Sequence, residues 1–180
     1  NGVVNQIKQE FDIVDNWIPC EIHPETPEDG IALEERFRGH DIAGMYRSLR
    51  QQGKNFGIEF GNVASLYNSH YALQAAEYAR DKGKYHLFHT KVFHAYFTRL
   101  EDIGNRSIIA SLALECGLDT DDMKQSINRG LYENRLKEAQ KQGKLYNITG
   151  VPTFIIAEKF RIVGAQPLDA FRKILTQVKT

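Results

Sequence analysis

The sequence has little that would attract a charged partner or a lipid bilayer. Its 180 residues carry 23 basic and 23 acidic side chains, so the formal net charge is zero. Nucleic acids and anionic membranes bind clustered basic residues, and a membrane span needs about 18 apolar residues in a row; the sequence has neither. We therefore expect no nucleic-acid partner and no membrane partner. No apolar signal segment stands at the start either, and we expect a cytoplasmic protein.

Cysteine is also scarce, with Cys20 and Cys116 as the two examples. Cys20 lies in the stretch 14–22, where Ile18, Cys20 and Ile22 alternate as on one face of a strand. Cys116 falls on the apolar face of a predicted helix. Because free cysteine behaves as a small apolar side chain, we interpret both as buried core residues rather than catalytic ones. A disulfide between them is the alternative, which geometry decides.

The chain can form a core without disulfide or metal staples. Hydrophobic residues make up 42% of it and aromatic residues 11%, which is sufficient for one compact domain of this length. His86, His89 and His94 crowd one predicted helix, and the first two have the i, i+3 spacing that can present two imidazoles to a metal. No acidic residue lies between them and large aromatic residues are interleaved, so we expect neither a metal site nor a cofactor.

The most informative stretch is 149–156, where a Gly-Val-Pro turn leads into a β-branched and aromatic run typical of a strand. Proline has no N–H to donate, and the bond between Val151 and Pro152 is a candidate cis peptide. We expect the backbone of Val151 to stay free, so that an extended peptide can dock there. An ordinary trans proline that only begins a strand is the alternative.

The remaining pattern places strands on both sides of a helical block. Val3, Val4, Ile7 and Phe11 predict a helix at the start, and the stretch 14–22 a strand. Runs at 153–156 and 160–163 predict a hairpin, followed by a helix from Leu168 to Val178. Between these parts we predict a short strand at 57–60 and helices at 42–52 ended by Gly53, from Asn68 or Ser69 to Gly83, at 85–98, at 108–116 before Gly117, from Asp119 through Ile127, and at 131–142 before Gly143.

Two C-terminal motifs, Gly-Val-Pro-Thr at 150–153 and Gly-Ala-Gln-Pro at 164–167, follow Asn68-Ser69, Glu77-Tyr78-Ala79-Arg80 and the aromatic run 92–97. In this order the sequence resembles the DsbA-like branch of the thioredoxin superfamily, especially its FrnE-type oxidoreductases. The resemblance implies an α/β, thioredoxin-like fold with an all-helical insertion. It further implies one domain over 1–180, with 1–24 and 145–180 as the thioredoxin-like part and about 31–144 as the mainly helical insertion.

The chemistry that the resemblance implies is thiol–disulfide exchange with protein or small thiol and disulfide substrates. In the family a first strand and a Cys-x-x-Cys precede the first helix. The resemblance therefore places the catalytic dithiol upstream of Asn1, leaves the first strand out of the given sequence, and makes none of the given residues the nucleophile. It also makes Val151, Pro152 and Thr153 the substrate-binding residues, facing the dithiol across a groove.

Two alternatives stay open. The 2-hydroxychromene-2-carboxylate isomerases and kappa-class glutathione transferases share this architecture and the Gly-Val-Pro turn, but have Ser in place of the dithiol and bind glutathione. They usually carry a Trp-Gly-x-Asp-Arg type of motif after the second C-terminal strand, whereas residues 162–167 here read Ile-Val-Gly-Ala-Gln-Pro, which favours the oxidoreductases. The second alternative is a non-catalytic, peptide-binding thioredoxin-like module.

Overall fold

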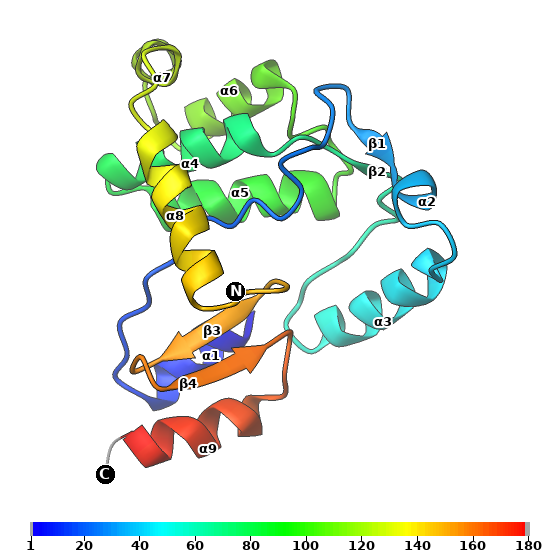
Figure 1. Ribbon diagram of the computed structural model, residues 1–180, viewed down its shortest axis with the longest axis vertical. Coiled ribbons are helices and arrows are strands. Elements are labelled where there is room, and N and C mark those ends of the chain that lie inside the picture. The colour runs from blue at the N-terminus through cyan, green and yellow to red at the C-terminus, as the bar shows by residue number, and fades with distance from the viewer. Residues whose placement is uncertain (1, 179–180) are drawn as a thin grey trace. The chain divides into compact units, whose positions relative to one another are not determined.

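The computed structural model describes residues 2–178 of the chain, which divide into two compact units (Figure 1). The hairpin unit takes in Asn1–Ile22 and Ala139–Thr180, and the helical unit takes in His23–Glu138. Both helices and strands are present, as the sequence predicts. Across residues 2–178, no helix combines the length and the apolar character that a membrane span requires.

The hairpin unit contains α1 (Gly2–Glu10), β3 (Thr153–Ile156), β4 (Phe160–Val163) and α9 (Leu168–Val178). The strands are antiparallel, with Thr153 opposite Val163 and Ile156 opposite Phe160. Their inner face and the apolar faces of the two helices form a core in which Ile7, Ile162, Phe171 and Leu175 are buried. The predicted opening helix, hairpin and closing helix are confirmed.

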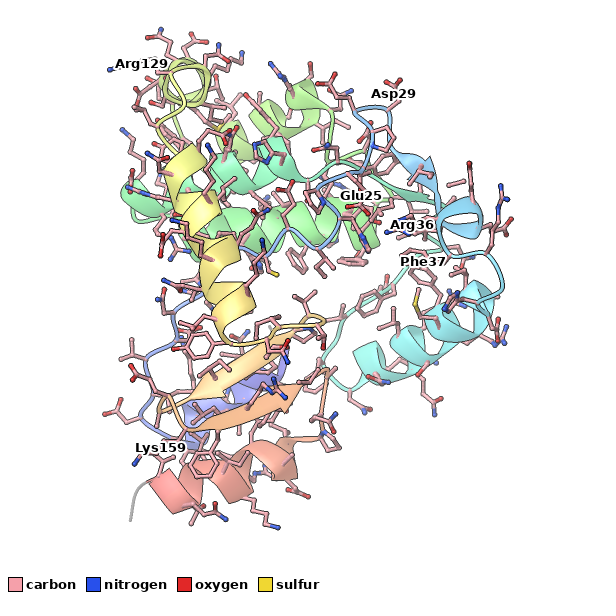
Figure 2. All side chains as sticks on the ribbon, viewed as in Figure 1. Glu25, Asp29, Arg36, Phe37, Arg129 and Lys159 are labelled. Carbon is pink, nitrogen blue, oxygen red and sulfur yellow. The ribbon has the colours of Figure 1, made fainter. Side chains whose placement is uncertain are left out.

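The hairpin turn carries backbone strain that a substitution should relieve. Ala157 and Glu158 have left-handed φ values of 51° and 57°, and the N–H of Lys159 donates to the carbonyl of Ile156 at 3.1 Å. Figure 2 shows Lys159 at this turn. Glycine adopts a left-handed φ without a steric penalty, so Glu158→Gly should raise the free energy of unfolding by about 0.5–1 kcal/mol in urea. Lys159→Gly is the matched control and should bring no gain; equal effects of the two would contradict this account.

Three helices of the helical unit, α5, α6 and α7, pack against α4 (Figure 1). Helix α4 contacts α5, α6 and α7, and Tyr78, Phe88, Ile109, Leu112 and Met123 are fully buried among them. The elements of this unit are β1 (Ile31–Ala32), α2 (Leu33–Arg36), α3 (Ile42–Lys54), β2 (Ser65–Leu66), α4 (His70–Asp81), α5 (Tyr85–Phe97), α6 (Arg106–Glu115) and α7 (Thr120–Asn128). Helix α8 (Glu133–Leu145) begins in the helical unit and ends in the hairpin unit.

The strand predicted at 14–22 is wrong, and so is the buried position predicted for Cys20. The described residues form two sheets of two strands each, β1 with β2 and β3 with β4, and none of them pairs with this stretch. An extended segment without a neighbour cannot form a ladder of hydrogen bonds. Exposure still alternates along it, but Val14 is 98% exposed and Ile18, Cys20 and Ile22 are exposed with it. The face interpreted as core therefore points outward.

Three smaller predictions also differ from the structure. The strand predicted at 57–60 is irregular, because the N–H of Ile58 donates to the carbonyl of Gly53 at 2.9 Å instead of to a strand. Gly53 and Gly143 lie inside α3 and α8 rather than beyond their ends. Both have a negative φ, so neither adopts the left-handed conformation that ends a helix.

Candidate functional site

The three residues predicted to bind substrate lie together at the turn that enters β3. We call residues 149–153 the Val151 turn. The Val151–Pro152 peptide bond is cis, and Val151 is 52% exposed. Neither the N–H nor the C=O of Val151 makes a hydrogen bond within residues 2–178. The turn therefore presents one unpaired backbone donor and one unpaired acceptor at the surface.

The residues on either side of Val151 are held in place. The hydroxyl Oγ1 of Thr153 donates to the carbonyl of Gly150 at 2.7 Å. The N–H of Gly164, just after β4, donates to the carbonyl of Pro152 at 2.8 Å. Thr153 itself pairs with Val163 in the hairpin. The free backbone groups of Val151 therefore lie between two residues, Gly150 and Pro152, whose carbonyls both accept hydrogen bonds.

The end of α8 leads directly into this turn. Asn147 follows the helix with a left-handed φ of 49°, and the N–H of Ile148 donates to the carbonyl of Gly143 at 2.8 Å, which closes the helix end. Nη1 of Arg161, on β4, lies 3.3 Å from the carbonyl oxygen of Tyr146 and 3.4 Å from that of Asn147. The sequence did not point to Arg161, because a charged residue at an outward strand position normally faces only solvent.

Neither cysteine is prepared for nucleophilic chemistry. Both thiols are free, and Cys116 is buried as predicted, whereas Cys20 is exposed. Burial raises the pKa of the Cys116 thiol, and partial desolvation likewise raises the pKa of Cys20. The attacking species in thiol chemistry is the thiolate, which requires a lowered pKa. Neither thiol therefore has the lowered pKa that an attacking thiolate requires.

Two histidines of α5, His86 and His89, take part in aromatic packing. His89 stacks on Tyr85 with ring centroids 5.6 Å apart, and lies 4.2 Å from the ring centroid of Phe93. Burial lowers the pKa of His89 to about 4, so its ring is neutral near pH 7. No three His, Cys, Asp or Glu side chains within residues 2–178 gather closely enough to hold a metal ion.

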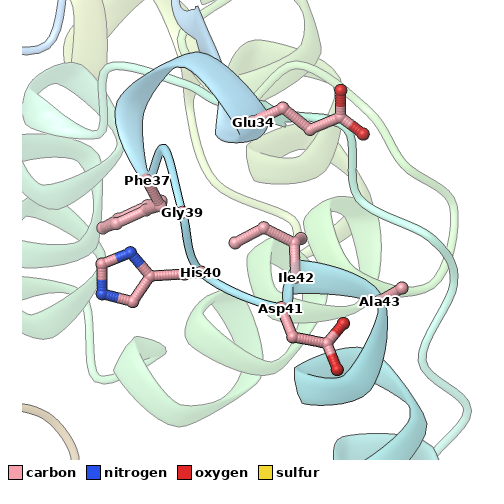
Figure 3. A pocket seen from close by; sticks show the side chains of 7 residues that line it. All are labelled: Glu34, Phe37, Gly39, His40, Asp41, Ile42 and Ala43. Atoms are coloured by element: carbon pink, nitrogen blue, oxygen red, sulfur yellow. The ribbon is translucent and has the colours of Figure 1, made fainter.

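The helical unit contains a surface pocket that the sequence did not predict (Figure 3). Its volume is about 320 Å³, and it is lined by Glu34, Phe37, Gly39, His40, Asp41, Ile42 and Ala43. The carboxylate of Asp41 is engaged at the start of α3, where it accepts the N–H of Gly44 at 2.7 Å. The pocket holds no cysteine or serine that could serve as a nucleophile, and none of the predicted site residues lines it.

Comparison with known proteins gives a family match and a related sequence. A family profile described as "DSBA-like thioredoxin domain" matches residues 2–176. The "Uncharacterized protein YwbO" of Bacillus subtilis (strain 168) is 28% identical over 169 residues, which cover 92% of this chain and 82% of that protein.

Two solved structures are similar in fold. The "probable DsbA oxidoreductase SCO1869" from Streptomyces coelicolor has a TM-score of 0.79 at 18% identity, over 89% of this chain and 73% of that one. A "putative protein disulfide isomerase" from Nitrosomonas europaea has a TM-score of 0.68 at 16% identity, over 97% of this chain and 87% of that one. These likenesses confirm the α/β, thioredoxin-like fold with a helical insertion.

Proposed function

The chain belongs to the DSBA-like thioredoxin domain family, and from this premise we propose that it is a thiol–disulfide oxidoreductase of the FrnE type whose substrate-binding residues are Val151, Pro152 and Thr153. The observation that carries the proposal is the exposed Val151, with a free N–H and a free C=O. An extended polypeptide can pair with two such groups as a strand adds to a sheet edge. The descriptions of the two similar structures, an oxidoreductase and a disulfide isomerase, support the same chemistry.

The reaction needs a thiolate beside this turn. That thiolate attacks one sulfur of a substrate disulfide, the S–S bond breaks, and the other sulfur leaves as a thiolate; a second thiol then resolves the mixed disulfide. Cys20 and Cys116 both have raised thiol pKa values and do not meet this need. We therefore place the dithiol upstream of Asn1, before α1, where the positive end of a helix dipole would lower the pKa of a cysteine.

The proposal extends to the organisation of the chain. The two compact units are taken as parts of one domain, with 1–24 and 145–180 as the thioredoxin-like part and about 31–144 as the helical insertion. The proposed substrates are protein or small thiols and disulfides, and the proposed location is the cytoplasm.

The natural-length protein should catalyse disulfide exchange without the help of Cys20 or Cys116. We expect Cys20→Ser combined with Cys116→Ala to leave the rate of insulin disulfide reduction within about twofold of the parent protein, because neither thiol has the lowered pKa of a nucleophile. Alanine is chosen at Cys116 because that position is buried. Loss of most of the activity in this variant would assign the chemistry to one of the two cysteines and contradict the proposal.

Measurements on the same natural-length protein distinguish the proposed function from its two alternatives. Its N-terminal sequence and intact mass give the residues before Asn1, and a Cys-x-x-Cys there agrees with the proposal. Ser at that place together with glutathione affinity would move the assignment to a glutathione-dependent isomerase or transferase. Binding of extended peptides without turnover would identify a non-catalytic peptide-binding module.

A further inference from the structure

Arg161 is an exposed arginine whose side chain contacts backbone carbonyls. It lies on the outward face of β4, since Ile162 beside it is buried and Arg161 and Val163 are exposed. Across the hairpin it is paired with Ile155. Instead of reaching a carboxylate, its Nη1 lies 3.3 Å and 3.4 Å from two successive backbone carbonyls, those of Tyr146 and Asn147.

The two carbonyls belong to Tyr146 and Asn147, the residues that directly follow the end of α8 at Leu145. Carbonyl groups at the C-terminal end of a helix lack donors from the next turn and carry partial negative charge. A guanidinium is suited to this place because its N–H groups diverge in one plane and can contact neighbouring acceptors together. Between Gly143 and Ala157 the single charged residue is Lys144, so no acidic side chain of this segment offers Arg161 a competing partner.

Four hydrogen bonds then hold the chain around Val151. Arg161 ties Tyr146 and Asn147 to β4, Thr153 ties the carbonyl of Gly150, and Gly164 ties the carbonyl of Pro152. The hydrogen bonds donated by Thr153 and Gly164 lie within the Val151 turn and the hairpin. Arg161 is the side chain that connects the segment entering the turn, at the end of α8, to β4.

From this arrangement we infer that Arg161 is a positioning residue for substrate binding, which rests on the proposed function of the Val151 turn. It touches no substrate atom. It sets the direction in which the chain leaves α8, and thereby the orientation of the Val151 N–H and C=O that receive an extended peptide. Backbone pairing depends on the alignment of donor and acceptor, so a loosened entry to the turn weakens peptide binding and leaves the sulfur chemistry intact.

Steady-state exchange by the natural-length protein tests the inference. Arg161→Met keeps the aliphatic stem and removes the guanidinium; we expect it to raise KM for a peptide disulfide about fivefold, as fits the loss of a modest hydrogen bond, with kcat within twofold. Exchange with hydroxyethyl disulfide, which has no peptide backbone to pair, should change less than twofold. Arg161→Lys, which keeps a cation and a donor, should recover part of the peptide KM.

Lys159→Met is the matched control. It also removes a cation from the hairpin, two residues away, where the side chain of Lys159 makes no hydrogen bond or ion pair within residues 2–178. It should leave both substrates unaffected. An unchanged peptide KM in Arg161→Met, or equal losses with both disulfides, would overturn the inference.

Amide hydrogen exchange in the 180-residue chain separates this inference from the proposed function. Arg161→Met should speed exchange at Asn147 and Ile148, whose N–H groups close the end of α8, about fivefold relative to Lys159→Met. Unchanged exchange at both positions would refute the positioning role whatever the activity. If the natural-length protein shows no disulfide exchange at all, the proposed function fails, and the amide rates still decide whether Arg161 orders the turn.

Discussion

Replacing Glu77 by Gln should lower the free energy of unfolding by about 2–3 kcal/mol, because it removes the central charge of a network of ion pairs. The Glu77 side chain is only 5% exposed. Both of its carboxylate oxygens accept from Nε of Arg80 at 3.2 Å, and Nη1 of Arg135 lies 3.6 Å from one of them. Glutamine keeps the size of the side chain and loses the charge that both arginines face.

The surroundings of Glu77 explain why the loss should be large. The guanidinium of Arg80 lies 3.9 Å from the centroid of the Tyr85 ring, and Arg135 also binds Asp81 through two hydrogen bonds of 2.7 and 3.1 Å. Without the Glu77 charge, the guanidinium of Arg80 loses a partner that is almost fully removed from solvent. The arginines are a third to a half exposed, so water screens part of the penalty, and we expect less than the cost of breaking a fully buried pair.

Urea unfolding of Glu77→Gln beside Glu115→Gln measures this effect. Glu115 is a matched control, because it forms an exposed pair with Lys91 at 2.6 Å and is 43% exposed. Water screens an exposed pair of this kind, so the control should lose much less free energy than Glu77→Gln. If the two variants lose the same free energy, the Glu77 network does not stabilise the helical unit.

The helices were predictable because their ends are local in sequence. Asp119 accepts the N–H groups of Asp121 and Asp122 at the start of α7, and Gly117 adopts a φ of 66° after α6. Both signals involve neighbours within three residues. The same holds for the Val151 turn, where a Gly-Val-Pro motif precedes an apolar strand.

The errors and omissions concern features that depend on distant residues. Whether residues 14–22 form a strand depends on a partner strand. The burial predicted for Cys20 depends on the same pairing, because Cys20 lies on the face that a sheet would bury. The strands β1 and β2 have two residues each, too few for an alternating pattern. Arg161 contacts the carbonyls of Tyr146 and Asn147, which follow α8, and Glu77 contacts Arg135 within α8. Composition and spacing carry no signal for such contacts.

His89 should make folding stability depend on pH between about 4 and 6.5. Burial, and then the positive charges nearby, which include His86 and Arg80, lower the pKa of His89 from 6.5 to about 4 in the folded state. Above pH 6.5 the ring is neutral in both the folded and the unfolded chain, and the full stability is present. As the pH falls below 6.5, His89 becomes protonated in the unfolded chain, whereas in the folded chain it stays neutral down to about pH 4. The free energy of unfolding therefore decreases, by about 3 kcal/mol in all.

Unfolding free energies measured by urea from pH 7.5 to pH 4.5 isolate this contribution. The carboxylates of Glu115 and Asp122, whose pKa values are lowered by hydrogen bonds from Lys91 and Lys82, lose their contributions only at lower pH, as they become protonated in the folded chain. His89→Phe keeps an aromatic ring between Tyr85 and Phe93 and cannot be protonated, so its stability should stay nearly flat over this range. His94→Gln removes an exposed histidine from the same helix and should retain the parent slope. If His89→Phe keeps that slope as well, the pH dependence arises elsewhere and His89 is not held neutral by its surroundings.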